Sequence, residues 1–201
     1  TLRLNGTAST LTLSSGTPQT FGTTVTLVEG RNTLAVSATD NATPANTGAS
    51  GVVYVTLDTT APVISITAPS SGGVTSQTSV NVTGGVDEPS VRTATLTLNG
   101  ATQTIPVQGQ RFNHSLNLAS GNNTVSVSAR DAAGNLGASQ TVTVEQDASV
   151  PRVRITAPIS GSSTNASSLT VTGSAVDTPA LAQATLTLNG VDQTITVTGN
   201  A

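Results

Sequence analysis

One hexapeptide, TLTLNG, occurs twice in this chain, at residues 95–100 and 185–190, and a near copy, TLRLNG, stands at 1–6. In each copy, leucines alternate with polar residues and run into an Asn-Gly pair. That pattern predicts a half-buried strand followed by a tight hairpin turn. A repeated strand and turn means that the chain must be read as an array of similar units.

Other segments recur at the same spacing. PVISITAP at 62–69 returns as PRVRITAP at 151–158, and GRNTLAVSATD at 30–40 returns as GNNTVSVSARD at 121–131. The period is therefore about 90 residues, well above the 20 to 50 that are typical of solenoid repeats. A unit of this size is a small domain with a core of its own.

The repeats divide the chain into three parts. Residues 58–147 form a complete unit, residues 1–57 match only the second part of a unit, and residues 148–201 match only the first part. The simplest interpretation is that the sequence is a stretch of a much longer polypeptide. The alternative is that neighbouring chains complete the two partial units by strand addition.

Thr, Ser, Val, Asn and Gly are frequent, and these residues favour strands and turns over helix. The complete unit contains seven segments in which apolar residues alternate with polar ones, separated by turns. We therefore predict an all-β chain of tandem immunoglobulin-like, seven-stranded β-sandwich domains, arranged as beads on a rod. The inward residues are Ile64 and Ile66; Val80 and Val82; Ala94, Leu96 and Leu98; Ile105 and Val107; Phe112, Leu116 and Leu118; Val125, Val127 and Ala129; Val142 and Val144.

The same pattern predicts five strands in residues 1–57 (strands C–G) and four in residues 148–201 (strands A–D). In the complete unit, Pro106 takes an outward position on the fourth strand, where its missing N–H is tolerated only at a sheet edge, as in strand D. The inward residues of the first part are Leu2 and Leu4; Leu11 and Leu13; Phe21, Val25 and Leu27; Leu34, Val36 and Ala38; Val53 and Val55. Those of the last part are Val153 and Ile155; Leu169 and Val171; Leu186 and Leu188; Ile195 and Val197.

Composition excludes several classes of function. The net charge is −3, all seven basic residues are Arg and none is Lys, so the chain lacks the clustered basic face that nucleic-acid binding requires. No apolar run reaches the roughly 18 residues of a membrane span. The chain has one His and no Cys, and it shows neither a Ser-His-Asp arrangement nor a Gly-rich phosphate loop, so we expect no enzyme activity.

Three motifs resemble those of bacterial Ig-like domain repeats, which are found in large cell-surface adhesins, biofilm proteins and extracellular filaments. They are ARDAAGN at 129–135, DTTAPVISI at 58–66 and VNVTGGVDEP at 80–89. The resemblance implies a structural stalk or filament segment at the bacterial cell surface or outside the cell, with neighbouring repeats as partners and self-association into fibres. A carbohydrate- or protein-binding module and a spacer within a large secreted enzyme are the alternatives.

Acidic residues recur in the linkers and loops that an Ig-like sandwich brings to one pole. Carboxylate and carbonyl oxygens are the ligands that Ca²⁺ prefers. Related adhesin repeats bind Ca²⁺ at their junctions, so the resemblance implies an interdomain calcium site. The alternative is that these side chains cap turns, with Arg92 and Arg130 close enough to neutralise them. The candidate ligands are Asp58, Asp87, Glu88 and Asp131, repeated as Asp147 and Asp177, with Asp40 at the position of Asp131 in the first part.

Three further features have ordinary explanations beside functional ones. His114 is expected to be a half-buried strand residue. Six Asn-X-Ser/Thr sequons, at Asn5, Asn41, Asn81, Asn113, Asn122 and Asn165, permit glycosylation, although a chain this rich in Asn, Ser and Thr contains them by chance. Outward threonines such as Thr95 and Thr97 form a solvated strand face, an O-glycan acceptor or a flat array of the kind that some ice-binding surfaces use.

Overall fold

A computed structural model describes residues 1–178 and 181–196. Across these residues every regular element is a β-strand and none is a helix, which confirms the all-β prediction. Accordingly, the described part of the chain has no helix that is long and apolar enough to cross a membrane.

The described residues form two compact units. The first unit contains Thr1–Pro62 together with Arg130–Leu136, and the second contains Val63–Ala129 and Gly137–Ala201. These boundaries differ from those of the sequence repeat, because the loop after residue 129 groups with residues 1–62. The division into 1–57, 58–147 and 148–201 stays a prediction.

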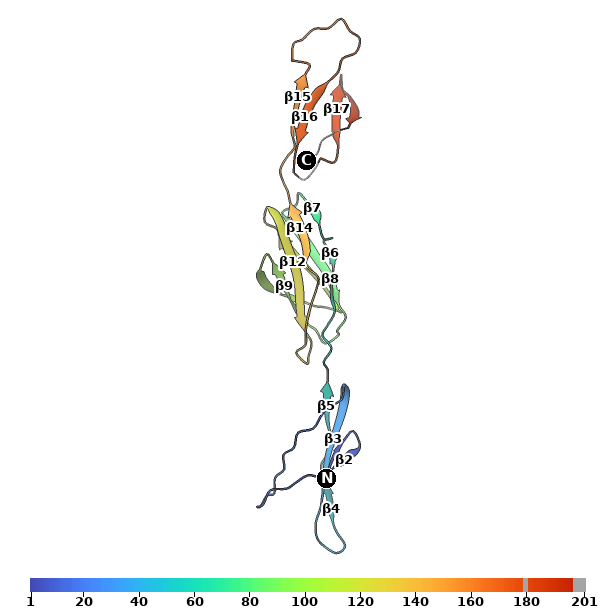
Figure 1. The fold of residues 1–201 in the computed structure, drawn as a ribbon, viewed down its shortest axis with the longest axis vertical. Coiled ribbons are helices and arrows are strands. Elements are labelled where there is room, and N and C mark those ends of the chain that lie inside the picture. Colours follow the sequence, from blue (N-terminus) through green and yellow to red (C-terminus); the bar gives the residue numbers. More distant parts are fainter. Residues whose placement is uncertain (179–180, 197–201) are drawn as a thin grey trace. The chain divides into compact units, whose positions relative to one another are not determined.

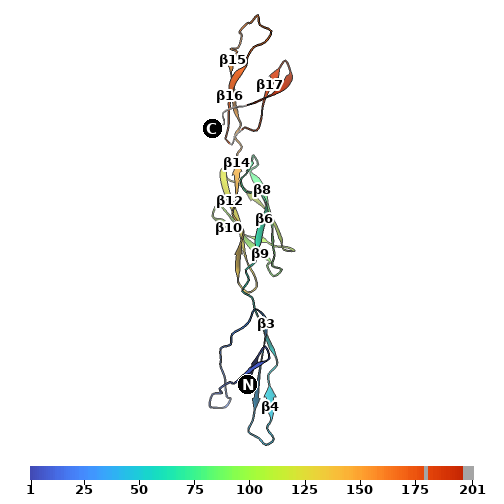
Figure 2. The same cartoon turned by 45° about the vertical axis from the view of Figure 1, so that its right-hand side comes forward.

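Two sheets form a sandwich in the second unit. One sheet has the strand order β11 (Arg111–Asn117), β8 (Ser79–Val86), β6 (Ile64–Ala68). The other has the order β10 (Ala101–Pro106), β9 (Thr93–Leu98), β12 (Gly121–Arg130), β14 (Val142–Gln146), β7 (Gly73–Thr75), and β13 (Leu136–Ala138) also pairs with β12. Figure 2 shows the sheets as separate layers, with β10 and β12 in one and β6 and β8 in the other.

The seven predicted strands of the complete unit are all present, and their inward residues form the core except for Leu118, which follows the end of β11. Because successive side chains of a strand point to opposite faces, the alternating apolar residues of both sheets meet between the layers. Leu96, Val82 and Val125 are fully buried, and Phe112 is 3% exposed. Ile66, Val80 and Leu98 are partly buried against this cluster. The short strands β7 and β13 were not predicted.

The fourth strand of the sandwich corrects one detail of the prediction. Pro106 is exposed on an edge strand, as expected. However, β10 pairs with β9 in the same sheet as β12 and β14, so it does not join β6, β8 and β11 as a strand D would. The cause is the two-residue Asn99-Gly100 turn, in which both residues have positive φ, because such a turn joins two neighbouring antiparallel strands.

Residues 1–57 form one sheet, in which the central strand β3 (Gly30–Thr39) pairs with β1 (Leu2–Leu4), β4 (Thr47–Ala49) and β5 (Val53–Leu57). The hairpin partner of β1 is β2 (Thr7–Ser9). Three of the five predicted strands are therefore present. Leu34 and Val36 on β3 are only half-buried, whereas Leu2 is buried.

The strands predicted around Leu11 and Leu13, and around Phe21, Val25 and Leu27, are wrong. The segment between β2 and β3 contains no strand, and Figure 1 draws it without an arrow. In the complete repeat, the counterpart of Phe21 is Phe112 on β11, which is held by β8. Residues 1–57 contain no counterpart of β6 or β8, so this segment has no strand to pair with, and Phe21 is 52% exposed.

The last part of the chain contains two strand pairs. The first joins β15 (Arg152–Ala157) to β16 (Thr172–Val176), and the second joins β17 (Ala184–Leu188) to β18 (Val191–Ile195). Leu169 and Val171 were predicted in a strand but precede β16. The predicted inward residues Val153, Ile155, Leu188 and Ile195 are exposed, since no second sheet covers them among the described residues. Val197 lies outside the described residues.

Candidate functional site

The Asn of each LNG turn bonds to a second, buried Asn. Asn99 has a φ of 50°, and its side-chain amide donates to Oδ1 of Asn123 over 2.9 Å. Asn123 is fully buried at the start of β12, and its own amide donates to the carbonyl oxygens of Ala119 and Gly121 at 2.8 and 2.9 Å. The backbone N–H of Ala119 also donates to Asn123 Oδ1. Each polar atom of this buried side chain is therefore satisfied within the fold.

The first repeat has the same arrangement. Asn5 Nδ2 donates to Asn32 Oδ1 over 2.9 Å, and Asn32, also fully buried, bonds to the backbone of Val28 and Gly30. We call the two arrangements the Asn locks.

The Asn locks were missed in the sequence. The signal was present, because TLRLNG and TLTLNG each carry an Asn before the final Gly, and GRNTL and GNNTV both place a second Asn at their third position. A polar residue at the start of an apolar strand is easily assigned to a loop. Here it closes the hairpin onto the neighbouring strand.

The candidate calcium ligands all accept hydrogen bonds from the protein, most of them within their own loops. Asp131 is 8% exposed, and its carboxylate accepts from the backbone N–H groups of Gly134 and Asn135 at 2.7 and 2.9 Å and from Asn135 Nδ2 at 2.8 Å. The amide of Asn135 also donates to the carbonyl oxygen of Asp58. Burial raises the pKa of Asp131, but these bonds from Asn135 and the loop backbone together hold the pKa below its usual value.

Asp40 takes the same part in the first repeat. Its carboxylate accepts from the side chain and backbone of Asn46 at 2.8 Å each and from the backbone N–H of Ala42 at 3.1 Å. These bonds, with the Asn46 side chain first, lower the pKa of Asp40. The Asp-to-Asn loop is therefore a second feature that the two repeats share.

The remaining candidates also accept hydrogen bonds. Asp58 and Glu88 cap turns, accepting from the N–H groups of Thr60 and Ser90, whereas Asp87 accepts at 2.7 Å from the N–H of Val63, 24 residues away. Ser149 donates its hydroxyl to both Asp147 and Asp177, and its bonds lower the pKa of Asp147. Within the described residues, no three His, Cys, Asp or Glu side chains gather in a way that could hold a metal ion. These bonds support the turn-capping alternative, and calcium binding stays a prediction.

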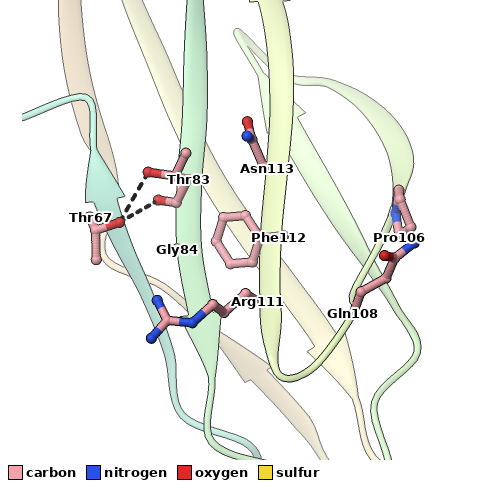
Figure 3. Close-up of a pocket in the computed structure, with 8 residues that line it drawn as sticks. All are labelled: Thr67, Thr83, Gly84, Pro106, Gln108, Arg111, Phe112 and Asn113. Carbon is pink, nitrogen blue, oxygen red and sulfur yellow. Dashed lines mark hydrogen bonds between the residues drawn. The ribbon is translucent and has the colours of Figure 1, made fainter.

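A concavity of about 460 Å³ lies on the second unit (Figure 3). Thr67 Oγ1 donates to the carbonyl oxygen of Thr83 and lies 3.1 Å from its hydroxyl. Arg111 is the one ionisable residue among those lining it, so it offers no acid–base pair. Its lining residues are Thr67, Thr83, Gly84, Pro106, Gln108, Arg111, Phe112 and Asn113.

Residues 62–148 match the family described as glucodextranase, domain B. This stretch holds the two-sheet sandwich, and its match confirms the resemblance found in the sequence. The complete repeat is an Ig-like domain. The fold is that of a non-catalytic module.

One curated relative is bacillopeptidase F of Bacillus subtilis (strain 168), which is 33% identical over 124 residues. The match covers 61% of this chain but only 8% of that protein. The chain therefore spans a small part of the relative's length.

Solved structures with similarity include fibronectin(III)-like modules of Clostridium thermocellum CbhA, at 16% identity and a TM-score of 0.31, covering 41% of this chain and 96% of that one. A 1.5-MDa bacterial ice-binding adhesin matches at 22% identity and a TM-score of 0.33, covering 65% of this chain and 47% of that one. The Bacteroides ovatus protein SGBP-B, solved with a mixed-linkage heptasaccharide, matches at 16% identity and a TM-score of 0.28, covering 76% of this chain and 38% of that one.

Proposed function

We propose that this chain is a non-catalytic stalk segment of a bacterial extracellular or cell-surface protein of the adhesin type. The observation that carries the proposal is the recurrence of the Asn lock, with the same atoms and the same 2.9 Å distance at Asn5–Asn32 and Asn99–Asn123. Polar side chains that would form a reactive or binding site elsewhere are here engaged in holding the hairpins and loops of each repeat. Side chains engaged in this way make each repeat rigid and are not free to bind or react with a ligand.

Two strands that lie near the two ends of the complete repeat in sequence support a load-carrying role. β7 and β14 pair in parallel, with Gly73, Val74 and Thr75 opposite Val144, Glu145 and Gln146. Two further backbone bonds extend this contact, from Gly72 to Thr143 and from Asp147 to Thr75. Because the strands are parallel and lie near opposite ends of the repeat, tension along the chain shears these bonds together rather than one after another.

Single-molecule force spectroscopy of the whole chain tests this role. We expect one unfolding event from residues 62–148, with a length gain of about 300 Å at roughly 3.5 Å per residue. Val74→Pro should lower the rupture force while circular dichroism shows the strand content retained, because Pro removes a donor from a short edge strand. Gradual extension of the unchanged chain without a force peak would contradict the stalk role.

A binding module is the second candidate, and one observation favours it. Tyr54 on β5 is 56% exposed, and the guanidinium carbon of Arg31 lies 3.7 Å from its ring centroid. An exposed ring is the kind of surface on which a sugar stacks. A glycan array with the unchanged chain and with Tyr54→Ala tests this, and hits that Tyr54→Ala abolishes would place binding ahead of the stalk role.

A spacer within a secreted enzyme is the third candidate. Its support is the partial match to bacillopeptidase F, whose name describes a peptidase. In that case the stalk properties hold unchanged, and another part of the polypeptide carries the activity. The full-length gene decides between an adhesin and an enzyme context.

A further inference from the structure

The concavity of the complete repeat is lined by polar side chains that the fold itself does not use. The guanidinium of Arg111 and the side-chain amides of Gln108 and Asn113 line it, and none of the three bonds to another described residue. The other two arginines of this repeat differ, because Arg92 and Arg130 each donate to a backbone carbonyl oxygen of a nearby loop. The concavity therefore offers hydrogen-bonding groups that are free to bind a ligand.

The backbone holds Arg111 in place without engaging its side chain. Gln108 and Arg111 exchange two backbone hydrogen bonds, at 2.9 and 3.0 Å, across the two-residue turn Gly109-Gln110. Both turn residues have positive φ, 55° and 62°, as a type I′ turn requires. Gln110 ties the turn to the end of β8, because its Nε2 donates to the carbonyl oxygen of Asp87 over 2.8 Å and its own carbonyl oxygen accepts from the N–H of Val86. Groups that are positioned in advance lose less conformational entropy when a ligand binds.

The surface beside Arg111 is open. The residue opposite it on β8 is Gly85, where an added Cβ would find its nearest atom 3.5 Å away. In Figure 3 the Arg111 side chain extends from β11 across β8 toward β6, on which Thr67 lies. Figure 3 also shows Pro106 and Gln108 on the other side of β11. The concavity therefore has a cationic end at Arg111 and a neutral end at Pro106.

These groups fit a saccharide that carries a carboxylate. A planar guanidinium presents paired N–H donors that match the two oxygens of a carboxylate. The amides of Gln108 and Asn113 can both donate and accept, as the hydroxyls of a sugar do. The exposed ring of Pro106 adds apolar surface for the C–H groups of a sugar ring. A volume of about 460 Å³ is within the range of small-molecule sites.

An acidic peptide is the competing ligand, and the lining argues against it. Arg111 is the one ionisable residue among the described residues that line the concavity, so the site suits one negative charge and not a run of them. The remaining polar groups are neutral amides and hydroxyls, which a ligand rich in hydroxyls satisfies better than a row of carboxylates does.

We propose that this concavity binds a uronate-containing oligosaccharide, with the carboxylate of one sugar unit paired to Arg111. The proposal goes beyond the stalk role and does not depend on it, because a chain that fails to resist force would present the same residues to the sugar. The net charge of the chain is −3, so general electrostatic attraction does not favour an acidic saccharide. Binding would therefore report the site itself.

Nuclear magnetic resonance of the ¹⁵N-labelled whole chain tests the proposal, with trigalacturonate as the probe. We expect the largest shifts in the backbone amides of Arg111 and Asn113 and in the side-chain N–H signals of Arg111, Gln108 and Asn113. Galactotriose of the same linkage lacks the carboxylates, and it should bind about tenfold more weakly or less, since hydrogen bonds to a charged group are stronger than neutral ones.

Two variants separate the site from a general effect of charge. Arg111→Gln should weaken trigalacturonate binding by about tenfold or more. Arg152→Gln removes the same charge from an exposed residue outside the concavity, and it should leave the binding unchanged. The spectrum of each free variant shows whether the fold is retained.

Four results would overturn the proposal. They are the absence of shifts with trigalacturonate, equal binding of galactotriose, binding that survives Arg111→Gln, and equally tight binding of a triglutamate peptide. Each of them leaves the stalk role standing, because that role is tested separately by the force at which the repeat unfolds.

Discussion

Phe112 and Phe21 occupy the same place in two copies of one repeat, yet the first is 3% exposed and the second 52% exposed. The difference does not come from the local sequence, since both follow a turn and precede alternating apolar residues. It comes from β6 and β8, which are present beside Phe112 and have no counterpart in residues 1–57. A strand of this kind forms when a partner supplies both the hydrogen bonds and the opposing apolar surface.

The largest expected effect comes from shortening the two phenylalanines. Phe112→Ala should destabilise the complete repeat by about 3–5 kcal/mol, because it leaves a cavity in a packed core. Phe21→Ala in the dilute chain should change the unfolding of that repeat by less than about 0.5 kcal/mol. Chemical denaturation of each variant gives both values, and equal losses would break the comparison.

Gly84 tests the close approach beneath Phe112. Gly84→Ala should cost about 1–3 kcal/mol, since its Cβ would overlap a backbone carbonyl oxygen and the aromatic ring. The matched control is Gly85→Ala, where the nearest atom is 3.5 Å away and the contact is ordinary. If both variants unfold at the same denaturant concentration, the packing of Phe112 on Gly84 is not what holds β11 in place.

The Asn lock of the complete repeat is the next test. Asn123→Ala should cost about 1–3 kcal/mol, because it leaves the backbone N–H of Ala119 and two carbonyl oxygens without the fully buried side chain that pairs with them. Its exposed neighbour offers the control, and Asn122→Ala should be nearly neutral. If Asn123→Ala leaves the free energy of unfolding unchanged, the Asn lock does not stabilise the repeat.

The loop carboxylates predict a pH dependence. Because the pKa of Asp131 lies below its usual 3.8 in the folded chain, its contribution to stability is complete above that value and is lost as the pH falls through the lower, folded pKa. The thermal midpoint should therefore fall at acid pH, and Asp131→Asn should reduce the fall. A midpoint that Asp131→Asn lowers equally at every pH would contradict this cause.

Calcium gives the smallest predicted effect. A site that binds only the folded chain raises the stability by about 1.4 kcal/mol at a tenfold excess over its dissociation constant. The calcium prediction therefore expects a higher thermal midpoint in Ca²⁺ than in EDTA, and no difference in Asp58→Ala or Asp131→Ala. Identical midpoints at millimolar Ca²⁺ would leave the carboxylates as turn caps.

Much of the complete repeat was predictable from its sequence, because alternation and Asn-Gly turns report strand positions directly. Pairing was harder to predict. The prediction that Pro106 lies on an edge strand was correct, but the sheet to which that strand belongs was wrong, because the Asn99-Gly100 turn pairs it with β9. The strand around Phe21 was wrong because periodicity shows which face a strand would bury and does not show whether a partner strand is present.

For the polar side chains of the site, the sequence indicated some of the residues but not the hydrogen bonds that they form. Asp131 and Asp40 were singled out from their recurrence as candidate calcium ligands, but their donors, Asn135 and Asn46, come from the far side of a loop whose length differs between the repeats. Asn32 and Asn123 were missed because their burial depends on a hairpin turn more than 20 residues away in the sequence.

Hydrogen exchange measured by mass spectrometry tests most directly whether β6 and β8 are what order the phenylalanine strand. In the dilute chain we predict strong protection of backbone amides in Arg111–Asn117 and rapid exchange in residues 20–26. Equal protection of the two segments in the dilute chain would contradict the account, because it would show that residues 20–26 order without a partner.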